Sequence, residues 1–280
     1  MRIDGRTMVA GLIGRPIAHS LSPALHNAWL AASGINGVYA PFELTGETAI
    51  EPLVQALRGG GSVRGLNVTA PFKEAALDAS DSADSAAKAA GAANLLLFRA
   101  DGSVHARNTD GIGLLRALYA QAGFDPDGAT VVVLGAGGAA RGAVTSLLAA
   151  GAFEVRVINR TLERAQALAD LAGPSCRAGS LADVSGALRN ADLLVNAATA
   201  ADASVVAALT VLRLGAVVMD MTYRPLSTAL LAGAEQLGLR TVDGLEMLIG
   251  QAVPSFEAFY GRSPPPIDIR SVALAAMDRG

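Results

Sequence analysis

Short apolar runs alternate with amphipathic segments along the first 110 residues. The apolar runs, bounded by turn residues, predict buried strands, and apolar positions spaced three or four apart predict helices between them. Asp101-Gly102 predicts a hairpin, because this pair tolerates the positive φ angles of a tight turn. This part is therefore predicted to be α/β with one antiparallel element. The expected strands are 8–13, 38–44, 63–68 and 94–98, and the expected helices are 24–32 and 49–57.

A second α/β region follows a predicted helix at 112–122 and a polar turn at 123–128. Strands and helices again alternate with short connections, which predicts a parallel, doubly wound sheet. We therefore predict two domains: residues 1–110, with a mainly parallel sheet and completed by helices in 244–280, and residues 111–243. The expected strands are 130–134, 154–158, 192–196 and 216–220, and the expected helices are 138–150, 162–172 and 227–237.

Composition excludes several classes of protein. Hydrophobic residues make up 51% and charged residues 17% of the chain, which argues against disorder. The net charge of −3 and the absence of a Lys/Arg run argue against nucleic-acid binding. Cys176 is the single cysteine, and the three histidines form no metal-ligand grouping with it. With apolar runs too short or too interrupted for a membrane span, we expect a cytoplasmic protein without a metal.

A glycine-rich loop joins the predicted strand 130–134 to the helix after it. Gly135 permits a tight turn, Gly137 lets backbone N–H groups approach a pyrophosphate, and Ala140 replaces the third glycine of the dinucleotide fingerprint. The strand before and the helix after are the context that this motif requires. We therefore predict a Rossmann-type cofactor domain. The assigned loop residues are Gly135, Ala136, Gly137, Gly138 and Ala139.

The end of the second strand favours NADP over NAD. An NAD site usually has an acidic residue there, but this strand ends Asn159-Arg160-Thr161, with Arg164 one turn later. A guanidinium suits a 2′-phosphate. The alternative is that both arginines are solvated residues at a helix start, although cations there oppose the helix dipole.

Two polar islands interrupt the apolar pattern, Asn67 to Lys73 and Asn108 to Gly111. Asn67 and Thr69 lie at the end of the predicted strand 63–68, at the edge where open α/β sheets bind ligands. Pro71 is expected at the first helical position, which places Lys73 in a first turn, where it needs a compensating partner. Lys73 and Asp110 are a candidate proton-transfer pair. Asp110 has an alternative role as the N-cap of 112–122, with Thr109 as the other candidate.

Other polar residues have both functional and structural interpretations. Ser22 before Pro23 is typical of a helix N-cap, whereas Ser20 and Ser22 in extended backbone would present two hydroxyls together to a carboxylate or hydroxyl. Asn94 could be a turn residue. Tyr223 follows a predicted strand end, and Gln251 is an unusual amide on an apolar helix. Together these residues indicate a ligand site.

The ordered set of motifs resembles the shikimate dehydrogenase family, from about Gly11 to Gly261. That resemblance implies NADPH-dependent reduction of 3-dehydroshikimate to shikimate, in aromatic amino-acid biosynthesis, by a monomer or homodimer. The motifs are 14–23, 67–73, 91–94, 108–111, 135–141, 159–161, 220–225 and 244–251.

The resemblance also implies a role for each matching position. Lys73 and Asp110 would be the catalytic pair, with Ser20 and Ser22 at the substrate carboxylate. Which of the pair moves the proton stays open; hydride delivery to a ketone builds charge on oxygen that an ammonium stabilises. Substrate would also contact Asn67, Thr69, Asn94, Tyr223 and Gln251, and cofactor would contact the glycine loop, Asn159, Arg160, Thr161, Arg164, Thr199, Met221 and Gly244.

One loop departs from the family pattern. The chain has Asn196-Ala-Ala-Thr199-Ala-Ala where the family usually has Asn-Ala-Thr followed by Ser or Pro and soon a glycine. A paralogue acting on quinate or aminoshikimate is therefore an alternative. A methylenetetrahydrofolate dehydrogenase is disfavoured by the serine pair and by Asn108-Thr-Asp-Gly111. A non-catalytic NADP-binding regulatory protein is disfavoured because Lys73 and Asp110 are both present.

Overall fold

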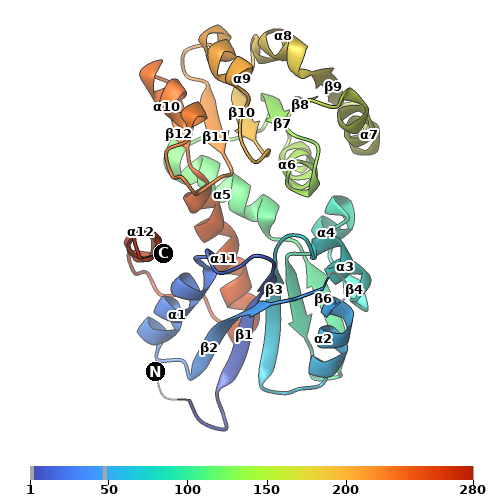
Figure 1. The fold of residues 1–280 in the computed structure, drawn as a ribbon, viewed down its shortest axis with the longest axis vertical. Helices are drawn as coiled ribbons and strands as arrows, with labels where there is room; N and C mark the ends of the chain where they lie inside the picture. The colour runs from blue at the N-terminus through green and yellow to red at the C-terminus, as the bar shows by residue number, and fades with distance from the viewer. Residues whose placement is uncertain (1–2, 47–48, 280) are drawn as a thin grey trace. The chain divides into compact units, whose positions relative to one another are not determined.

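The computed structural model describes residues 3–46 and 49–279, which divide into two compact units (Figure 1). The first unit comprises Met1–Thr109 and Gln251–Gly280, and the second comprises Asp110–Gly250. The predicted boundaries are 110/111 and 243/244. In the structure the two units meet in the sequence at 109/110 and at 250/251. The second of these boundaries falls within the long helix α11 (Gly244–Tyr260).

The first unit is built on a mixed sheet with strand order β2-β1-β3-β5-β6-β4. β1 pairs in parallel with β2 and β3, whereas β5 is antiparallel to β3 and β6. Gly102, at φ 82°, lies in the turn of the β5–β6 hairpin, which confirms the predicted Asp-Gly turn. The strands are β1 (Met8–Gly14), β2 (Gly37–Glu43), β3 (Val63–Val68), β4 (Ser82–Ala83), β5 (Leu95–Phe98) and β6 (Val104–Arg107).

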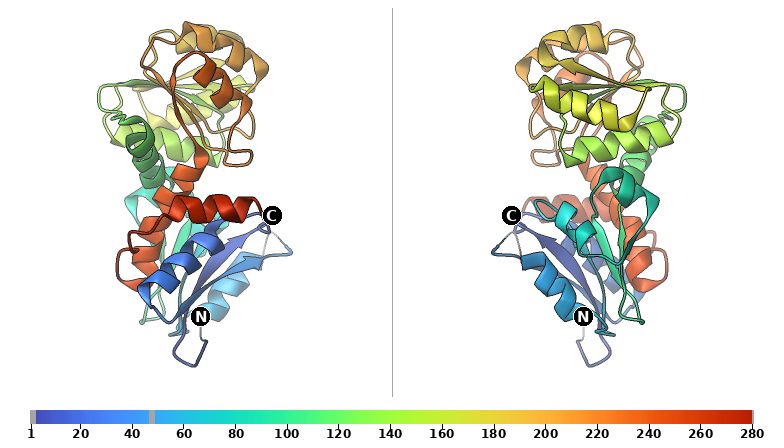
Figure 2. Two further views of the ribbon diagram at one scale, coloured as in Figure 1. Left: turned by 90° about the vertical axis from the view of Figure 1, so that its left-hand side faces the viewer. Right: turned by 90° about the vertical axis from the view of Figure 1, so that its right-hand side faces the viewer.

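Helices cover the first unit's sheet with apolar side chains. Val54 and Ala76, from the second and third helices, pack with Ile13, Leu66 and Val68 of the strands. The first and last helices, α1 and α12, lie side by side (Figure 2). Among residues 3–46 and 49–279, no helix is long and apolar enough to cross a membrane. The helices are α1 (Ser22–Ser33), α2 (Ile50–Leu57), α3 (Lys73–Asp78), α4 (Ser85–Ala90), α11 and α12 (Ile269–Met277).

The second unit has a parallel sheet with strand order β12-β11-β10-β7-β8-β9. Helices α5, α6 and α7 and helices α8, α9 and α10 flank this sheet (Figure 1). Apolar side chains of the first group and of the second group form two separate cores with the strands. The order in which successive strands are added to the sheet reverses between β7 and β10, and such folds bind ligands at this point, beyond the carboxyl ends of the strands. The predicted doubly wound class is thus confirmed.

The bounds of the second unit's elements agree with prediction for the long apolar segments. The strands are β7 (Thr130–Leu134), β8 (Glu154–Asn159), β9 (Cys176–Ser180), β10 (Leu193–Asn196), β11 (Val217–Asp220) and β12 (Arg240–Val242). The helices are α5 (Asp110–Ala122), α6 (Gly138–Ala149), α7 (Leu162–Ala172), α8 (Val184–Leu188), α9 (Ala203–Ala208) and α10 (Ala229–Gln236).

The pattern does not predict the shortest elements. β9 carries Arg, Ala, Gly and Ser, and is a strand because it pairs with β8 at the sheet edge. β12 pairs with β11 in the same way, and α4 is held at its start by Asp84, whose carboxylate accepts from the Ala87 N–H at 2.7 Å. The sequence periodicity of such short segments is weak, because tertiary pairing or a single cap, rather than a repeated apolar pattern, makes them form.

An aromatic core of the first unit encloses His26 of α1. Its ring stacks on Tyr39 of β2, with centroids 4.1 Å apart, and meets the edge of Trp29 at 5.7 Å. Neither ring nitrogen has a hydrogen-bond partner among the residues that the structure describes. Burial therefore lowers the pKa of His26 from 6.5 to about 3, and the ring stays neutral.

The depressed pKa of His26 predicts acid sensitivity. Unfolding raises this pKa to its ordinary value, so stability is lost as pH falls from 6.5 towards 3. Between pH 7 and pH 5 we expect this one group to remove about 2 kcal/mol from the unfolding free energy. Urea denaturation should show that loss shrinking in His26→Phe, while the exposed-site control His19→Gln keeps it. An equal loss in His26→Phe would contradict the assignment.

Candidate functional site

The carboxyl end of β3 carries the first polar island. Asn67 is buried within β3, and Thr69 follows it, with its N–H bonded to the Ile13 carbonyl at 2.8 Å. A Cβ on Gly14 would overlap the Thr69 side chain, so a glycine is required beside it. The turn then closes through a bond from the Phe72 N–H to the Thr69 carbonyl at 3.1 Å.

The expected helical start at Pro71 is wrong. α3 begins at Lys73, because Pro71 lies in the turn that the Phe72 N–H closes on the Thr69 carbonyl, and the Phe72 side chain is buried in the apolar core. Lys73 nevertheless lies in the first turn, and its carbonyl accepts from the Ala93 N–H at 2.8 Å. This bond ties the lysine backbone to the segment that carries Asn94.

Buried amides join Asn67 and Asn94. Asn67 Nδ2 donates to the Asn94 carbonyl at 3.1 Å and to Ser255 Oγ at 2.9 Å, while its Oδ1 accepts from the Tyr39 hydroxyl at 2.9 Å. Both N–H bonds of this amide are therefore used inside the protein. Asn67 thus holds β3, the Asn94 turn and α11 together.

A second set of bonds brings Gln251 to Asn94 and Thr109. The Asn94 Oδ1 accepts from the Thr109 N–H at 2.8 Å, and Asn94 Nδ2 lies 3.4 Å from Gln251 Oε1. Thr109 Oγ1 lies 3.3 Å from the same Gln251 oxygen. The turn interpretation of Asn94 therefore gives way to a role as a junction. Three predicted substrate residues, Asn67, Asn94 and Gln251, lie together in the first unit.

The N-cap interpretation of Ser22 is wrong. Ser22 is the first residue of α1 and is buried, whereas the cap position is Leu21, which has no side-chain cap. Leu21 is also helical, at φ −87° and ψ −11°, so the extended backbone expected between the serines is absent. Ser20 Oγ accepts from the Ser22 N–H at 3.3 Å, which makes the pair a tight turn at the helix start.

Asp110 begins α5, directly after Thr109. A carboxylate in a first helical turn is stabilised by the helix dipole. Because the Thr109 hydroxyl bonds to Gln251, the backbone just before Asp110 is anchored. A Cβ on Gly111 would overlap Ser146 of α6, so a glycine lets α5 approach α6 at this point.

The glycine loop of the second unit has the geometry of an anion cradle. Gly135 has φ 102°, and a Cβ there would meet the Ala197 and Ala198 backbone at 3.3 Å. Gly137 is the N-cap of α6 and supplies no side-chain cap, and the loop is exposed there. Uncapped N–H groups at an exposed helix start are what a pyrophosphate needs, so these residues fit a dinucleotide.

The end of β8 exposes the predicted 2′-phosphate residues. Arg160, Thr161 and Arg164 are exposed, and Asn159 Nδ2 donates to the Thr161 carbonyl at 2.9 Å, which shapes the turn into α7. Hydrogen bonds from Ser204 are the main cause that lowers the pKa of the Asp202 carboxyl, and the charge of the Arg160 guanidinium also lowers it. An arginine pair at this edge suits NADP.

Asp220, which carries no predicted role, organises the loop after β11. Its buried carboxylate accepts from Asn196 Nδ2 at 3.0 Å, from the Thr222 N–H at 3.0 Å and from the Thr228 hydroxyl at 2.8 Å. The bonded loop carries Met221 and the half-buried Tyr223. The sequence signal for this role was a carboxylate, Asp220, at the end of the apolar strand β11.

The remaining predicted cofactor residues lie near the ends of β10 and β11. A Cβ on Gly244 would overlap the Met221 carbonyl, so these two backbones are in close contact. Thr199 is exposed in the divergent loop, whose Ala198 N–H bonds to Asn196 Oδ1 at 3.2 Å. Among residues 3–46 and 49–279, no group of His, Cys, Asp and Glu is arranged to hold a metal.

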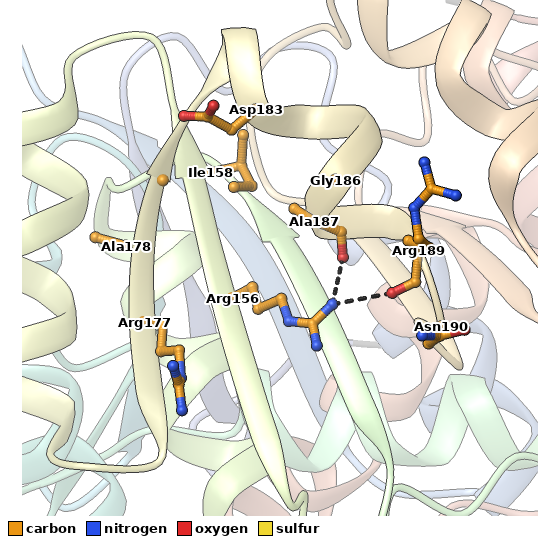
Figure 3. Close-up of a pocket in the computed structure, with 10 residues that line it drawn as sticks. Arg156, Ile158, Arg177, Ala178, Asp183, Gly186, Ala187, Arg189 and Asn190 are labelled. Atoms are coloured by element: carbon orange, nitrogen blue, oxygen red, sulfur yellow. Dashed lines mark hydrogen bonds between the residues drawn. The ribbon is translucent and has the colours of Figure 1, made fainter.

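A cavity of about 470 Å³ lies apart from these residues, over β8 and β9 beside α8 (Figure 3). Arg156 Nη1 donates to the Ala187 and Arg189 carbonyls at 2.7 and 3.1 Å, and Glu154 pairs with Arg156 and Arg177, each at 2.6 Å. Cations stabilise helix C-termini, so Arg156 has a structural role. The cavity belongs to the edge of the sheet.

Comparison with known proteins identifies the family. Residues 12–96 match the shikimate dehydrogenase substrate binding domain, and residues 119–245 match shikimate / quinate 5-dehydrogenase. A shikimate dehydrogenase (NADP(+)) of Caulobacter vibrioides is 53% identical over 97% of this chain and 96% of its own length. The chain belongs to the shikimate dehydrogenase family.

Solved structures share the fold of this family member. Shikimate 5-dehydrogenase of Thermus thermophilus, in complex with NADP(H) and shikimate, has a TM-score of 0.84 and 36% identity, covering 96% of this chain and 99% of its own. Quinate dehydrogenase of Corynebacterium glutamicum, in complex with NAD, has a TM-score of 0.87 and 30% identity, with coverage of 96% and 99%. Since one fold carries both names, substrate preference depends on side chains.

We predict that Arg160→Asp weakens NADP binding in this family member by at least tenfold and affects NAD much less. A carboxylate at 160 repels a 2′-phosphate and accepts from a 2′-hydroxyl. Steady-state KM values for the two cofactors measure the difference. Arg189→Asp, an equal charge change at another exposed arginine of the second unit, is the control. Equal losses for NADP and NAD would contradict the 2′-phosphate role.

Proposed function

We propose that this chain is an NADP-dependent shikimate dehydrogenase, which reversibly reduces 3-dehydroshikimate to shikimate in aromatic amino-acid biosynthesis. Its 53% identity to a shikimate dehydrogenase (NADP(+)), over nearly the whole of both chains, carries the proposal. The buried junction of Asn67, Asn94 and Gln251 supports it, because it places amides beside the ends of strands where a hydroxylated ring would bind.

Lys73 and Asp110 form the catalytic pair in this proposal. NADPH, when bound, supplies the hydride. The Lys73 ammonium stabilises the charge that develops on the substrate oxygen and exchanges a proton there, and Asp110 binds a ring hydroxyl and orients the lysine. Only two of the chain's basic side chains are lysines, Lys73 and Lys88. Lysine can give up a proton where arginine cannot, so the choice at 73 fits proton transfer.

The substrate's other groups are assigned to further polar residues of the chain. We assign the carboxylate to Ser20 and Ser22, and ring hydroxyls to Thr69, Asn94 and Gln251. Tyr223 and the remaining lone pair of Asn67 Oδ1 complete the set. NADP is assigned, as proposed from the sequence, to the glycine loop, Asn159, Arg160, Thr161, Arg164, Thr199, Met221 and Gly244. The cytoplasmic location and the monomeric or dimeric state stay predictions.

We predict that Lys73→Ala lowers kcat by about a hundredfold or more, which is the scale of acid–base assistance. NADPH binding, followed by fluorescence titration, should be unchanged, because Lys73 belongs to the first unit and the cofactor loop to the second. Lys88→Ala is the matched control, since Lys88 is the other lysine and is exposed on α4. Full turnover in Lys73→Ala would remove it from the mechanism.

Substrate choice is tested by steady-state kinetics. We expect kcat/KM to be highest for shikimate with NADP, and lower for quinate, aminoshikimate and every reaction with NAD. Quinate as the best substrate would place the chain with the quinate dehydrogenases. Binding of NADPH without turnover of any of the three would favour a regulatory protein.

A further inference from the structure

Tyr39 contacts Asn67, which is assigned to substrate, although no role is assigned to Tyr39 itself. Its hydroxyl donates to Asn67 Oδ1 at 2.9 Å, and its backbone is hydrogen-bonded to Asn27 of α1. Asn67 stands at the end of β3, and Ser22 begins α1. Tyr39 therefore joins α1, which begins at Ser22, to β3, which carries Asn67: its backbone bonds to α1 and its hydroxyl bonds to Asn67.

The Tyr39 backbone and ring are held firmly by α1. The Asn27 side chain accepts from the Tyr39 N–H at 3.0 Å and donates to the Tyr39 carbonyl at 2.8 Å. One side-chain amide therefore hydrogen-bonds to both backbone groups of Tyr39. The His26 ring stacks on the Tyr39 ring within 9° of parallel. Tyr39 is 2% exposed. These contacts leave the hydroxyl little freedom to move.

The chemistry of the hydroxyl suits a permanent link. Burial raises the pKa of Tyr39 well above its ordinary value, so the group keeps its proton and remains a donor. With the Tyr39 donor on its oxygen, the Asn67 amide has one orientation in which Nδ2 reaches both Ser255 and the Asn94 carbonyl. Without that donor, the amide loses one of the contacts that select this orientation.

We propose that Tyr39 is a positioning residue, which sets the spacing between Ser22 and the Asn67–Asn94 junction and thereby matches the site to a ring of fixed size. The inference rests on the proposed function, because it takes Ser22 as a carboxylate ligand. Tyr39 lies behind the residues assigned to substrate and acts through them. Its loss should therefore weaken substrate binding more than the chemical step.

The test is Tyr39→Phe, which removes one hydroxyl and keeps the ring, the stack on His26 and both bonds to Asn27. We expect KM for shikimate to rise about tenfold, the scale of one lost buried hydrogen bond. We expect kcat to change less than threefold and KM for NADP to stay constant. Because KM does not depend on the concentration of active enzyme, partial unfolding does not obscure the result.

Tyr260→Phe is the matched control. Tyr260 belongs to the same aromatic core, and its buried hydroxyl has no hydrogen-bond partner among the described residues. Removing that hydroxyl breaks no bond, so KM should not change. A lower melting temperature in Tyr39→Phe with KM unchanged would show a merely structural role and overturn the inference.

Ser22→Ala separates this inference from the proposed function. If Ser22→Ala leaves KM for shikimate unchanged, the assigned carboxylate site fails. If Ser22→Ala raises KM and Tyr39→Phe does not, only the role of Tyr39 fails. If Tyr39 sets the distance between Ser22 and the Asn67–Asn94 junction, the double variant should show less than the product of the two single effects, as coupled sites do. Fully multiplicative effects would contradict this positioning.

Discussion

The first unit's site depends on the burial of two side-chain amides, those of Asn67 and Asn94. An amide removed from water costs free energy unless its donors and acceptors are bonded again. Here Tyr39 of β2, Thr109 just before α5, and Gln251 and Ser255 of α11 supply those bonds. Because each bond offsets the cost of burying an amide, a shift of one element relative to the others would cost free energy. The same bonds therefore restrain the backbone at Thr69 and Lys73, which lies next to these amides in the fold.

The second unit uses backbone proximity and a buried carboxylate for the same purpose. Gly135 turns with a positive φ against the Ala197–Ala198 backbone, and Gly250 lies against the Gly113 backbone, where a Cβ would be 3.0 Å from the carbonyl. Asp220 gathers Asn196, Thr222 and Thr228 around the end of β11. These contacts hold the backbone around the ends of β7, β10 and β11 in place, which preorganises the anion cradle.

Sequence patterns predict well where one signal dominates. The strand Thr130–Leu134 and the loop after it are recognisable because an apolar run meets glycines at fixed spacing. The predictions fail where tertiary contacts override a local rule. Ser22 was expected to cap α1 but is its first residue, and Leu21 occupies the cap position. Pro71 was expected to begin α3, but the helix begins at Lys73, with Phe72 at the cap position. The edge strand β9 has no periodicity that could reveal it.

The sequence by itself determined the fold class, the family and the chemical types of the site residues, because periodicity and motif spacing are local properties of the chain. Only the tertiary structure decided which of those residues meet. Tyr39 and Ser255 carry no local signal, yet they hold Asn67 from positions 28 and 188 residues away. Such partnerships arise from packing, where a buried polar group bonds to whichever side chains the fold brings beside it.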